Sequence, residues 1–181
     1  MARIWLVSGE RGAGKTSLCS AVVQWVRAAG WDVAGLLSPA VLADGRKLGI
    51  DVLDLRSGGR RRLANARLFE EERDNGIHTR AWAFDPEALD WGDRVLQAVG
   101  SCDLLVVDEL GMLEFERGQG WLSGLTALDG RQYRHALAVI RPELLATAQE
   151  RWPDAQIVAV QQLDEQQARR LADEILAGLG D

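Results

Sequence analysis

The segment that most constrains the fold of this chain is a glycine-rich stretch at residues 9–16, which reads Gly-Glu-Arg-Gly-Ala-Gly-Lys-Thr. It fits the phosphate-binding pattern G-x-x-x-x-G-K-[ST] at every fixed position. The apolar run at residues 4–7 comes directly before it, and a pattern of helical period over residues 15–29 follows it. A strand that enters such a loop and a helix that leaves it are the setting that the pattern requires. The sequence therefore predicts a phosphate-binding loop, or P-loop (Walker A), within an α/β domain.

Each fixed position of the loop has a chemical reason. Glycines at positions 9, 12 and 14 permit the backbone angles that turn successive N–H groups toward a phosphate, and the helix that begins near Lys15 adds its positive N-terminal dipole. We expect Lys15 to reach the β and γ phosphates as a catalytic cation, and the hydroxyl of Thr16 to bind Mg²⁺. The predicted nucleotide-binding residues are Gly9, Glu10, Arg11, Gly12, Ala13, Gly14, Lys15, Thr16 and Ser17.

Short apolar runs alternate with segments of helical period along the chain. Strands are predicted at residues 4–7, 33–37, 48–55, 77–84, 104–107, 136–140 and 157–160, and helices at 15–29, 86–99, 120–128, 142–152 and 164–179. The first, second, fifth and last of these strands are almost wholly apolar, so we expect helices on both of their faces. Alternating strands and helices form a parallel sheet with crossover helices. We predict a three-layer α/β fold with a mostly parallel sheet.

Residues 36–65 interrupt that alternation, because they contain no helical pattern. Turn signals at residues 43–46 and 57–60 join strand-like runs there, which predicts an antiparallel hairpin or meander at the edge of the sheet. We therefore expect one domain over residues 1–181, with a β-hairpin insertion at about residues 38–65. The polar residues 69–76 are predicted to form a mobile surface loop, and Gly180 to cap the last helix.

A second functional segment is the apolar strand that ends in Asp108 and Glu109. Ligands of open parallel sheets collect at the carboxyl ends of the strands, where the glycine loop would also lie. Asp108 is therefore predicted to hold Mg²⁺ as the acidic residue of a Walker B strand, directly or through water. Glu109 is predicted to orient and polarise a water for attack on the γ phosphate. Glu114 would either support the metal or face solvent.

Arginines at two further places have two possible roles each. Arg141 follows the strand at residues 136–140. If that strand lies beside the P-loop strand, the guanidinium would emerge next to the γ phosphate and be catalytic; otherwise it would only precede the helix at 142–152. The cluster Arg60-Arg61-Arg62 would be either solvated or part of a lid over the nucleotide.

Composition excludes several classes of protein. The 181 residues are 47% hydrophobic and 27% charged, which rules out global disorder, and the net charge of −6 argues against a surface that binds nucleic acid through bulk charge. No apolar run is long enough for a membrane span or a signal peptide, so we expect a cytoplasmic protein without a membrane partner.

Cys19 and Cys102 are interpreted as core residues. Lys15 and Lys47 are the only lysines among 21 basic residues, so lysine is present where the loop needs a compact charge.

Together, the glycine loop and residues 108–114, Asp-Glu-Leu-Gly-Met-Leu-Glu, resemble the small nucleoside-triphosphatase family first described from thermophiles, whose animal members are called cancer-related nucleoside-triphosphatases. Residues 45–51 also resemble the G-x-R-x-G-F-D hairpin of that family. The chain departs from the family at residues 35–42, where it lacks the acidic and basic residues of the pattern Gly-Phe-x-Thr-x-Glu-x-Arg. The resemblance implies a RecA-like P-loop NTPase domain that hydrolyses nucleoside triphosphates, with Mg²⁺ as cofactor and loose selectivity among ATP, GTP, CTP and UTP.

Three functions share such a phosphate site: a nucleoside-triphosphatase that uses water, a kinase for nucleotides or small molecules, and a nucleotide-dependent switch or accessory protein with slow hydrolysis. A kinase would need an acceptor pocket and an arginine-bearing lid, for which the arginine cluster of the insertion is the candidate. Asp108 and Glu109 favour water as the nucleophile, so hydrolysis to nucleoside diphosphate and phosphate is the predicted reaction. The physiological substrate, any protein partner and the oligomeric state stay open at this point.

Overall fold

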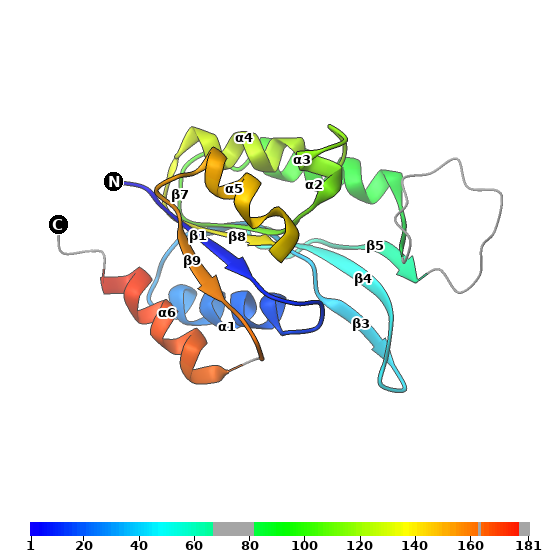
Figure 1. Ribbon diagram of the computed structural model, residues 1–181, viewed down its shortest axis with the longest axis horizontal. Coiled ribbons are helices and arrows are strands. Elements are labelled where there is room, and N and C mark those ends of the chain that lie inside the picture. The colour runs from blue at the N-terminus through cyan, green and yellow to red at the C-terminus, as the bar shows by residue number, and fades with distance from the viewer. Residues whose placement is uncertain (67–81, 163, 178–181) are drawn as a thin grey trace.

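The computed structural model describes residues 1–66, 82–162 and 164–177, which form three layers (Figure 1). Within them, nine strands form one sheet in the order β6-β5-β4-β2-β7-β8-β1-β9, with β3 paired to β4. The strands are β1 (Arg3–Ser8), β2 (Val33–Leu37), β3 (Ala40–Ala43), β4 (Arg46–Asp54), β5 (Arg60–Ala66), β6 (Trp82–Phe84), β7 (Cys102–Leu110), β8 (Tyr133–Ile140) and β9 (Gln156–Ala159). The helices are α1 (Lys15–Ala28), α2 (Pro86–Gln97), α3 (Met112–Phe115), α4 (Leu122–Gly130), α5 (Leu145–Arg151, after a 3-10 turn at Pro142–Leu144) and α6 (Glu165–Ala177).

The parallel part of the sheet consists of β2, β7, β8, β1 and β9. β8 lies between β7 and β1, with Leu137 opposite both Val106 and Trp5. The predicted three-layer α/β fold with a mostly parallel sheet is thereby confirmed. Because β8 is inserted beside the P-loop strand, the carboxyl ends of β1, β7 and β8 meet at one edge of the sheet.

The core has two halves, because successive side chains of a strand face opposite sides of the sheet. In β1, Ile4 and Leu6 pack on the side of α2, α4 and α5, whereas Trp5 and Val7 pack on the side of α1 and α6 (Figure 1). All four side chains are buried. Every residue of β2 is buried as well, as predicted for a strand with helices on both faces.

The predicted burial of the last strand is wrong. β9 is the outermost strand next to β1, and Gln156, Ile157 and Ala159 are exposed. An apolar run alone does not distinguish a central strand from an edge strand, since both use the same β-forming residues. The position in the sheet, which sequence does not show, decides the burial.

The interruption of the alternation is an antiparallel meander of β3, β4 and β5, which β6 continues. It joins the parallel strands through pairing of β4 with β2, and Figure 1 shows it extending from one end of the sheet. Arg60, Arg61 and Arg62 lie on strand β5 rather than on a turn. Of the predicted strand at 77–84 only residues 82–84 are described; the predicted loop at 69–76 and the cap at Gly180 lie outside the described residues.

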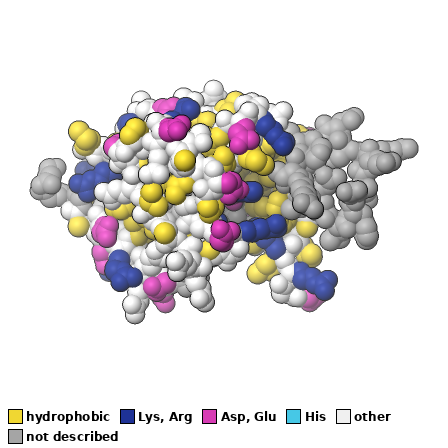
Figure 2. Space-filling model, viewed as in Figure 1, with side chains coloured by type: hydrophobic (Ala, Val, Ile, Leu, Met, Phe, Trp, Pro, Cys, Tyr) yellow, Lys and Arg dark blue, Asp and Glu magenta, His cyan; other side chains and the backbone are white. Residues whose placement is uncertain are grey.

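Two helical segments differ from the prediction. Helix α3 follows β7 almost directly, where no helix is predicted, because its four residues are too few to produce a periodic pattern. The helix predicted from residue 120 begins at Leu122. None of the helices described is both long and apolar enough to cross a membrane. On the face shown in Figure 2, acidic and basic side chains lie intermixed rather than gathered by sign.

Candidate functional site

The glycine loop leaves the sheet at the carboxyl end of β1. Gly12 and Gly14 have φ angles of +83° and +98°, which residues with a side chain rarely adopt. Gly9 is required for a different reason from the predicted one, because its φ is not positive. A Cβ atom at Gly9 would lie 2.0 Å from the carbonyl oxygen of Val160, so the space beside the end of β9 admits only glycine.

Lys15 begins α1 and is buried. Its ammonium donates hydrogen bonds to the carbonyl oxygens of Gly9 (2.6 Å) and Glu10 (2.9 Å), so the side chain is folded back over the loop. A phosphate in the loop would compete for this ammonium, because hydrogen bonds between two charged groups are the stronger ones. Arg11 and Ser17 of the predicted binding set are exposed.

Asp108, at the end of β7, is almost fully buried, with 1% of its surface exposed. Its carboxylate accepts a hydrogen bond from the N–H of Ser38 (3.0 Å) and one from the hydroxyl of Thr16. Burial raises the pKa of Asp108 from 3.8 to about 6, and the bond from Ser38 opposes that rise. An ionised carboxylate in this place is costly by itself, and a bound cation would offset the cost.

Glu109 and Arg141 form an ion pair between the ends of β7 and β8. The two side chains are 34% and 41% exposed, so a ligand can reach both. Arg141 therefore lies at the edge of the sheet where β7 ends in Asp108 and Glu109. That Glu109 acts on water and that Arg141 contacts phosphate both stay predictions.

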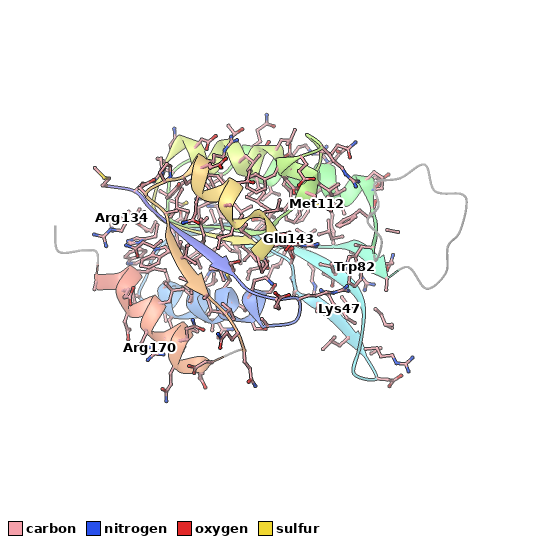
Figure 3. The ribbon with its side chains drawn as sticks, in the orientation of Figure 1. Lys47, Trp82, Met112, Arg134, Glu143 and Arg170 are labelled. Atoms are coloured by element: carbon pink, nitrogen blue, oxygen red, sulfur yellow. The ribbon has the colours of Figure 1, made fainter. Side chains whose placement is uncertain are left out.

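Sequence reasoning missed two residues of the site, Ser38 and Lys47. Lys47 comes from β4, and its ammonium lies 5.0 Å from the ring centre of Trp82, at the same end of the molecule (Figure 3). Desolvation lowers the pKa of Lys47, while the nearby carboxylates of Glu109 and Asp108 raise it. A signal for Lys47 is present in the composition, because both lysines of the chain lie at this site. Ser38 gives no such signal.

The interpretation of Glu114 as a residue that faces solvent is wrong. Its side chain is 7% exposed, and its carboxylate oxygens accept the backbone N–H groups of Gly111 (2.8 Å) and Trp121 (2.9 Å). Burial raises the pKa of Glu114, while these two hydrogen bonds lower it. Glu114 thus ties the start of α3 to the start of α4, and its support of the metal stays a prediction.

The arginine cluster of β5 is held by its own neighbours. Arg60 and Arg62 pair with Asp51 at 2.7 and 2.6 Å, and Arg61 lies 5.0 Å from the ring centre of Trp91. None of the three is among the described residues that line the pocket at Asp108. The structure therefore does not support the lid interpretation, and Lys47 is the cation of the insertion that reaches the site.

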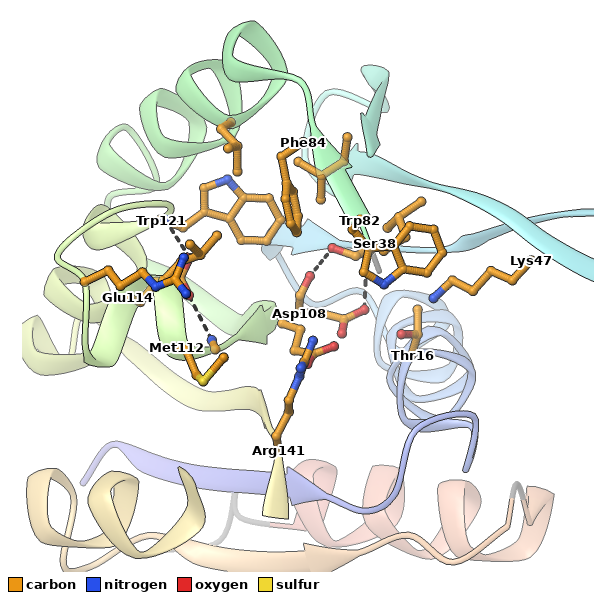
Figure 4. A pocket seen from close by; sticks show the side chains of 17 residues that line it. Thr16, Ser38, Lys47, Trp82, Phe84, Asp108, Met112, Glu114, Trp121 and Arg141 are labelled. Carbon is orange, nitrogen blue, oxygen red and sulfur yellow. Dashed lines mark hydrogen bonds and ion pairs between the residues drawn. The ribbon is translucent and has the colours of Figure 1, made fainter. Parts of the chain in front are cut away.

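The start of α1, the ends of β2, β7 and β8, the insertion with β6, helix α2 and the segment from α3 to the start of α4 enclose one pocket (Figure 4). Its polar lining is Thr16, Ser38, Lys47, Asp108, Glu109, Gly111, Glu114, Arg117 and Arg141. Its apolar lining is Ile50, Leu63, Trp82, Phe84, Leu89, Met112, Leu113 and Trp121. In Figure 4, Asp108 lies between Arg141 on one side and the rings of Phe84 and Trp121 on the other.

The residues present fit Mg²⁺ that arrives with a nucleotide. The described part of the chain contains no cluster of three or more His, Cys, Asp or Glu that would hold a metal by itself. Mg²⁺ is usually bound through one or two carboxylates together with substrate phosphates and waters. The hydroxyl of Thr16 beside the carboxylate of Asp108 is a donor set of that kind.

A family of known proteins matches nearly the whole chain. A family model described as NTPase matches residues 4–176. Proteins named nucleoside-triphosphatase THEP1 are similar to this chain: that of Ignicoccus hospitalis is 31% identical over 110 residues, and that of Pyrobaculum aerophilum 33% over 110 residues. Each match covers 61% of this chain, and 60% and 58% of those proteins respectively. The chain thus matches less than two thirds of the length of these relatives.

Two solved structures share the fold over nearly all of the chain. A human cancer-related nucleoside triphosphatase superposes with a TM-score of 0.70 at 19% identity, covering 99% of this chain and 98% of that one. THEP1 from the hyperthermophile Aquifex aeolicus superposes with a TM-score of 0.64 at 16% identity, covering all of both chains. At these identities the likeness establishes the fold, a P-loop arrangement of mostly parallel strands.

Proposed function

Because this chain belongs to the NTPase family, we propose that it hydrolyses nucleoside triphosphates to nucleoside diphosphate and phosphate, with Mg²⁺ as cofactor. The observation that carries the proposal is the meeting of four segments at one pocket. Thr16 comes from the end of the P-loop, Asp108 and Glu109 from the end of β7, Arg141 from the end of β8, and Lys47 from β4. Each supplies a group that phosphoryl transfer to water needs.

The loop and the start of α1 would bind the phosphates. Lys15 would leave the two carbonyl oxygens it now contacts and bind the β and γ phosphates. Thr16 and Asp108 would hold Mg²⁺ on the side of the phosphates that faces away from Lys15. When bound, Mg²⁺ neutralises charge on the β and γ phosphate oxygens, which favours attack on phosphorus. Asp108 must be ionised to hold Mg²⁺. Binding of the metal would therefore lower the pKa of Asp108, which burial raises.

Glu109 would orient the attacking water and accept its proton. A carboxylate needs a fixed direction for this, and the ion pair with Arg141 supplies one. The guanidinium has five N–H donors, so Arg141 can bind a γ phosphate oxygen while it still holds Glu109. We therefore assign to Arg141 the stabilisation of charge on the γ phosphate during transfer.

We propose loose selectivity among ATP, GTP, CTP and UTP. The residues assigned above all act on phosphate, metal or water, and none of them is assigned to a base. The name of the relatives, nucleoside-triphosphatase, likewise refers to a class of substrates and not to one nucleotide.

The test is phosphate release from each of the four triphosphates, with Mg²⁺ and without any acceptor, by the parent and by Lys15→Ala. We expect the parent to release phosphate from all four. Lys15→Ala should bind and hydrolyse none of them, because the charge that holds the β and γ phosphates is gone. Circular dichroism should show that the variant is folded. Normal turnover by a folded Lys15→Ala protein would exclude the P-loop as the site of hydrolysis.

A further inference from the structure

The meander brings one lysine to the end of β7. Lys47 lies on β4 and lines the same pocket as Thr16, Asp108 and Glu109. In the sheet, β4 and β8 lie on opposite sides of β7. Lys47 and Arg141 therefore reach the end of β7 from different sides, and Figure 4 shows them on different sides of Asp108. The site thus has a cation from each flank of the strand that carries its two carboxylates.

Lys47 rests on an aromatic ring. Its ammonium lies 5.0 Å from the ring centre of Trp82, and Figure 4 shows the side chain directed toward that ring. Trp82 is only 5% exposed, so its ring is fixed by packing. The guanidinium of Arg11, in the P-loop, lies 5.4 Å from the centre of the same ring. Lys47 itself is exposed, so a ligand from solvent can reach its ammonium.

The positive charge of Lys47 is not neutralised by a carboxylate. Among the residues that the structure describes, Lys47 takes part in no ion pair. The ring of Trp82 attracts the ammonium but carries no net charge. Glu109 is already paired with Arg141, and Asp108 is the residue assigned to Mg²⁺. The charge of Lys47 is therefore available to an anion that enters the site.

The surroundings of Lys47 indicate which phosphate that anion is. Desolvation lowers the pKa of Lys47, and Glu109 is the neighbouring charge with the largest effect on it. In the proposed reaction, the water held by Glu109 attacks the γ phosphate, so that phosphate must lie at this end of the site. The other phosphates lie among the loop amides and at the start of α1. A nucleoside diphosphate thus has no group next to Lys47.

We propose that Lys47 binds the γ phosphate and is the residue by which the site distinguishes a nucleoside triphosphate from a diphosphate. The inference rests on the proposed binding of Mg²⁺ and a triphosphate at the P-loop. Upon binding, the ammonium leaves the ring of Trp82 and donates a hydrogen bond to a γ phosphate oxygen, because a bond between two charged groups is the stronger contact.

The role of Lys47 differs from that of Arg141. The guanidinium of Arg141 is shared with Glu109 and is assigned to the charge that develops during transfer. Lys47 shares its charge with no carboxylate, so it acts already on the bound triphosphate. After hydrolysis its partner departs as inorganic phosphate. The diphosphate is then held only by the P-loop and the metal, which favours its release.

The test is calorimetric titration of the full chain with Mg·ADP and with the Mg²⁺ complex of β,γ-imido-ATP, which keeps a γ phosphate and resists hydrolysis. Lys47→Met removes the charge and keeps the length of the side chain. We expect it to weaken binding of the imido analogue at least about tenfold and of ADP less than about twofold, since a hydrogen bond between charged groups is lost with the analogue alone. Lys47→Arg keeps the charge and should restore most of the preference for the analogue.

Arg46→Met is the matched control. Arg46 is the neighbouring exposed cation of β4, its side chain faces the other side of the strand, and it is not among the residues that line the pocket. Both affinities should stay within about twofold of the parent. Retained ADP affinity in Lys47→Met shows at the same time that the P-loop of this variant is folded.

Equal losses for the two nucleotides in Lys47→Met, or no loss, would overturn the assignment, because Lys47 would then not contact the γ phosphate. A loss confined to the analogue in Arg117→Met instead of Lys47→Met would also overturn it, since Arg117 is another cation of the pocket lining. In these cases the parent still binds both nucleotides, and the proposed function stands. A parent that binds neither nucleotide would refute the proposed function, and the role of Lys47 with it.

Discussion

At the scale of single residues, Asp108 is a group whose ionised form the fold disfavours. Its carboxyl is buried beside Thr16 and Ser38, and burial raises its pKa from 3.8 to about 6. The carboxyl therefore holds its proton more tightly in the folded chain than in the unfolded chain. As the pH rises from 3.8 to about 6, the folded state loses stability relative to the unfolded state. Above about pH 6 the destabilisation is fully present and is on the order of 3 kcal/mol.

We therefore expect Asp108→Asn to raise the free energy of unfolding of the nucleotide-free protein at pH 8 by about 1–3 kcal/mol. The amide has the same shape, and its oxygen can still accept the N–H of Ser38. At pH 4 the carboxyl is protonated in the folded protein, so the two proteins should differ much less. Urea unfolding at both pH values checks this. Equal stability at pH 8 would mean that the surroundings do not disfavour the carboxylate.

Arg141 allows a second prediction for one side chain. If its guanidinium binds the γ phosphate, Arg141→Ala should lower kcat at least about tenfold while ADP affinity hardly changes, since ADP lacks that phosphate. Arg134→Ala, a truncation at the other end of the same strand, is the control and should leave kcat within about twofold. Equal losses of ATP and ADP affinity, or no loss of kcat, would contradict the contact with the γ phosphate. Arg141 would then only precede the turn that follows β8.

Single residues also show where sequence reasoning stops. Lys15, Thr16 and Asp108 were predictable because each has a fixed place in a motif, next to the strand that carries it. Ser38 and Lys47 reach the site only through the pairing of β2 and β4 with distant parts of the chain, which no local pattern reveals.

At the scale of elements, the segment between β7 and α4 depends on one buried carboxylate. Glu114 accepts the N–H groups of Gly111 and Trp121, which stand at the starts of α3 and α4. We expect Glu114→Ala to lower the free energy of unfolding by about 2–4 kcal/mol, since two buried donors lose their acceptor. Glu116→Ala, at an exposed position two residues on, should change it by less than about 0.5 kcal/mol. Urea unfolding compares them; similar values for both would contradict the role of Glu114.

The elements differ in how well their sequences predict them. Runs such as Val33–Leu37 are central strands with helices on both sides, so an unbroken apolar pattern finds them. β9 has a similar pattern but lies at the edge, and α3 is too short to show a period. The meander was predictable as antiparallel because its turns are marked by glycine, whereas its contribution of Lys47 to the site depends on where β4 joins the sheet.

At the scale of the whole molecule, the sheet order explains why several segments of the chain line one pocket. β8 lies between the P-loop strand and β7, so three strand ends and the meander open on the same edge. The motifs predicted this edge as the site, because ligands of parallel sheets collect at the carboxyl ends of strands. They did not predict the apolar lining of the pocket, which the packing of β6 and α2 against the meander creates.

The central claim is that Glu109 activates water for attack on a γ phosphate held by the P-loop. Glu109→Gln tests it most directly, because the amide keeps the shape of the side chain and removes its negative charge and its ability to accept a proton. Mg·ATP affinity and phosphate release are measured together, without an acceptor. Glu143→Gln, the same change at an exposed position near the site, is the control.

We predict that Glu109→Gln binds Mg·ATP about as well as the parent, since Lys15, Thr16 and Asp108 are unchanged, and releases phosphate at least about a hundredfold more slowly. Glu143→Gln should match the parent in both measurements. Phosphate release by Glu109→Gln at the parental rate would contradict the account, because Glu109 would then be only a partner of Arg141 at the end of a strand.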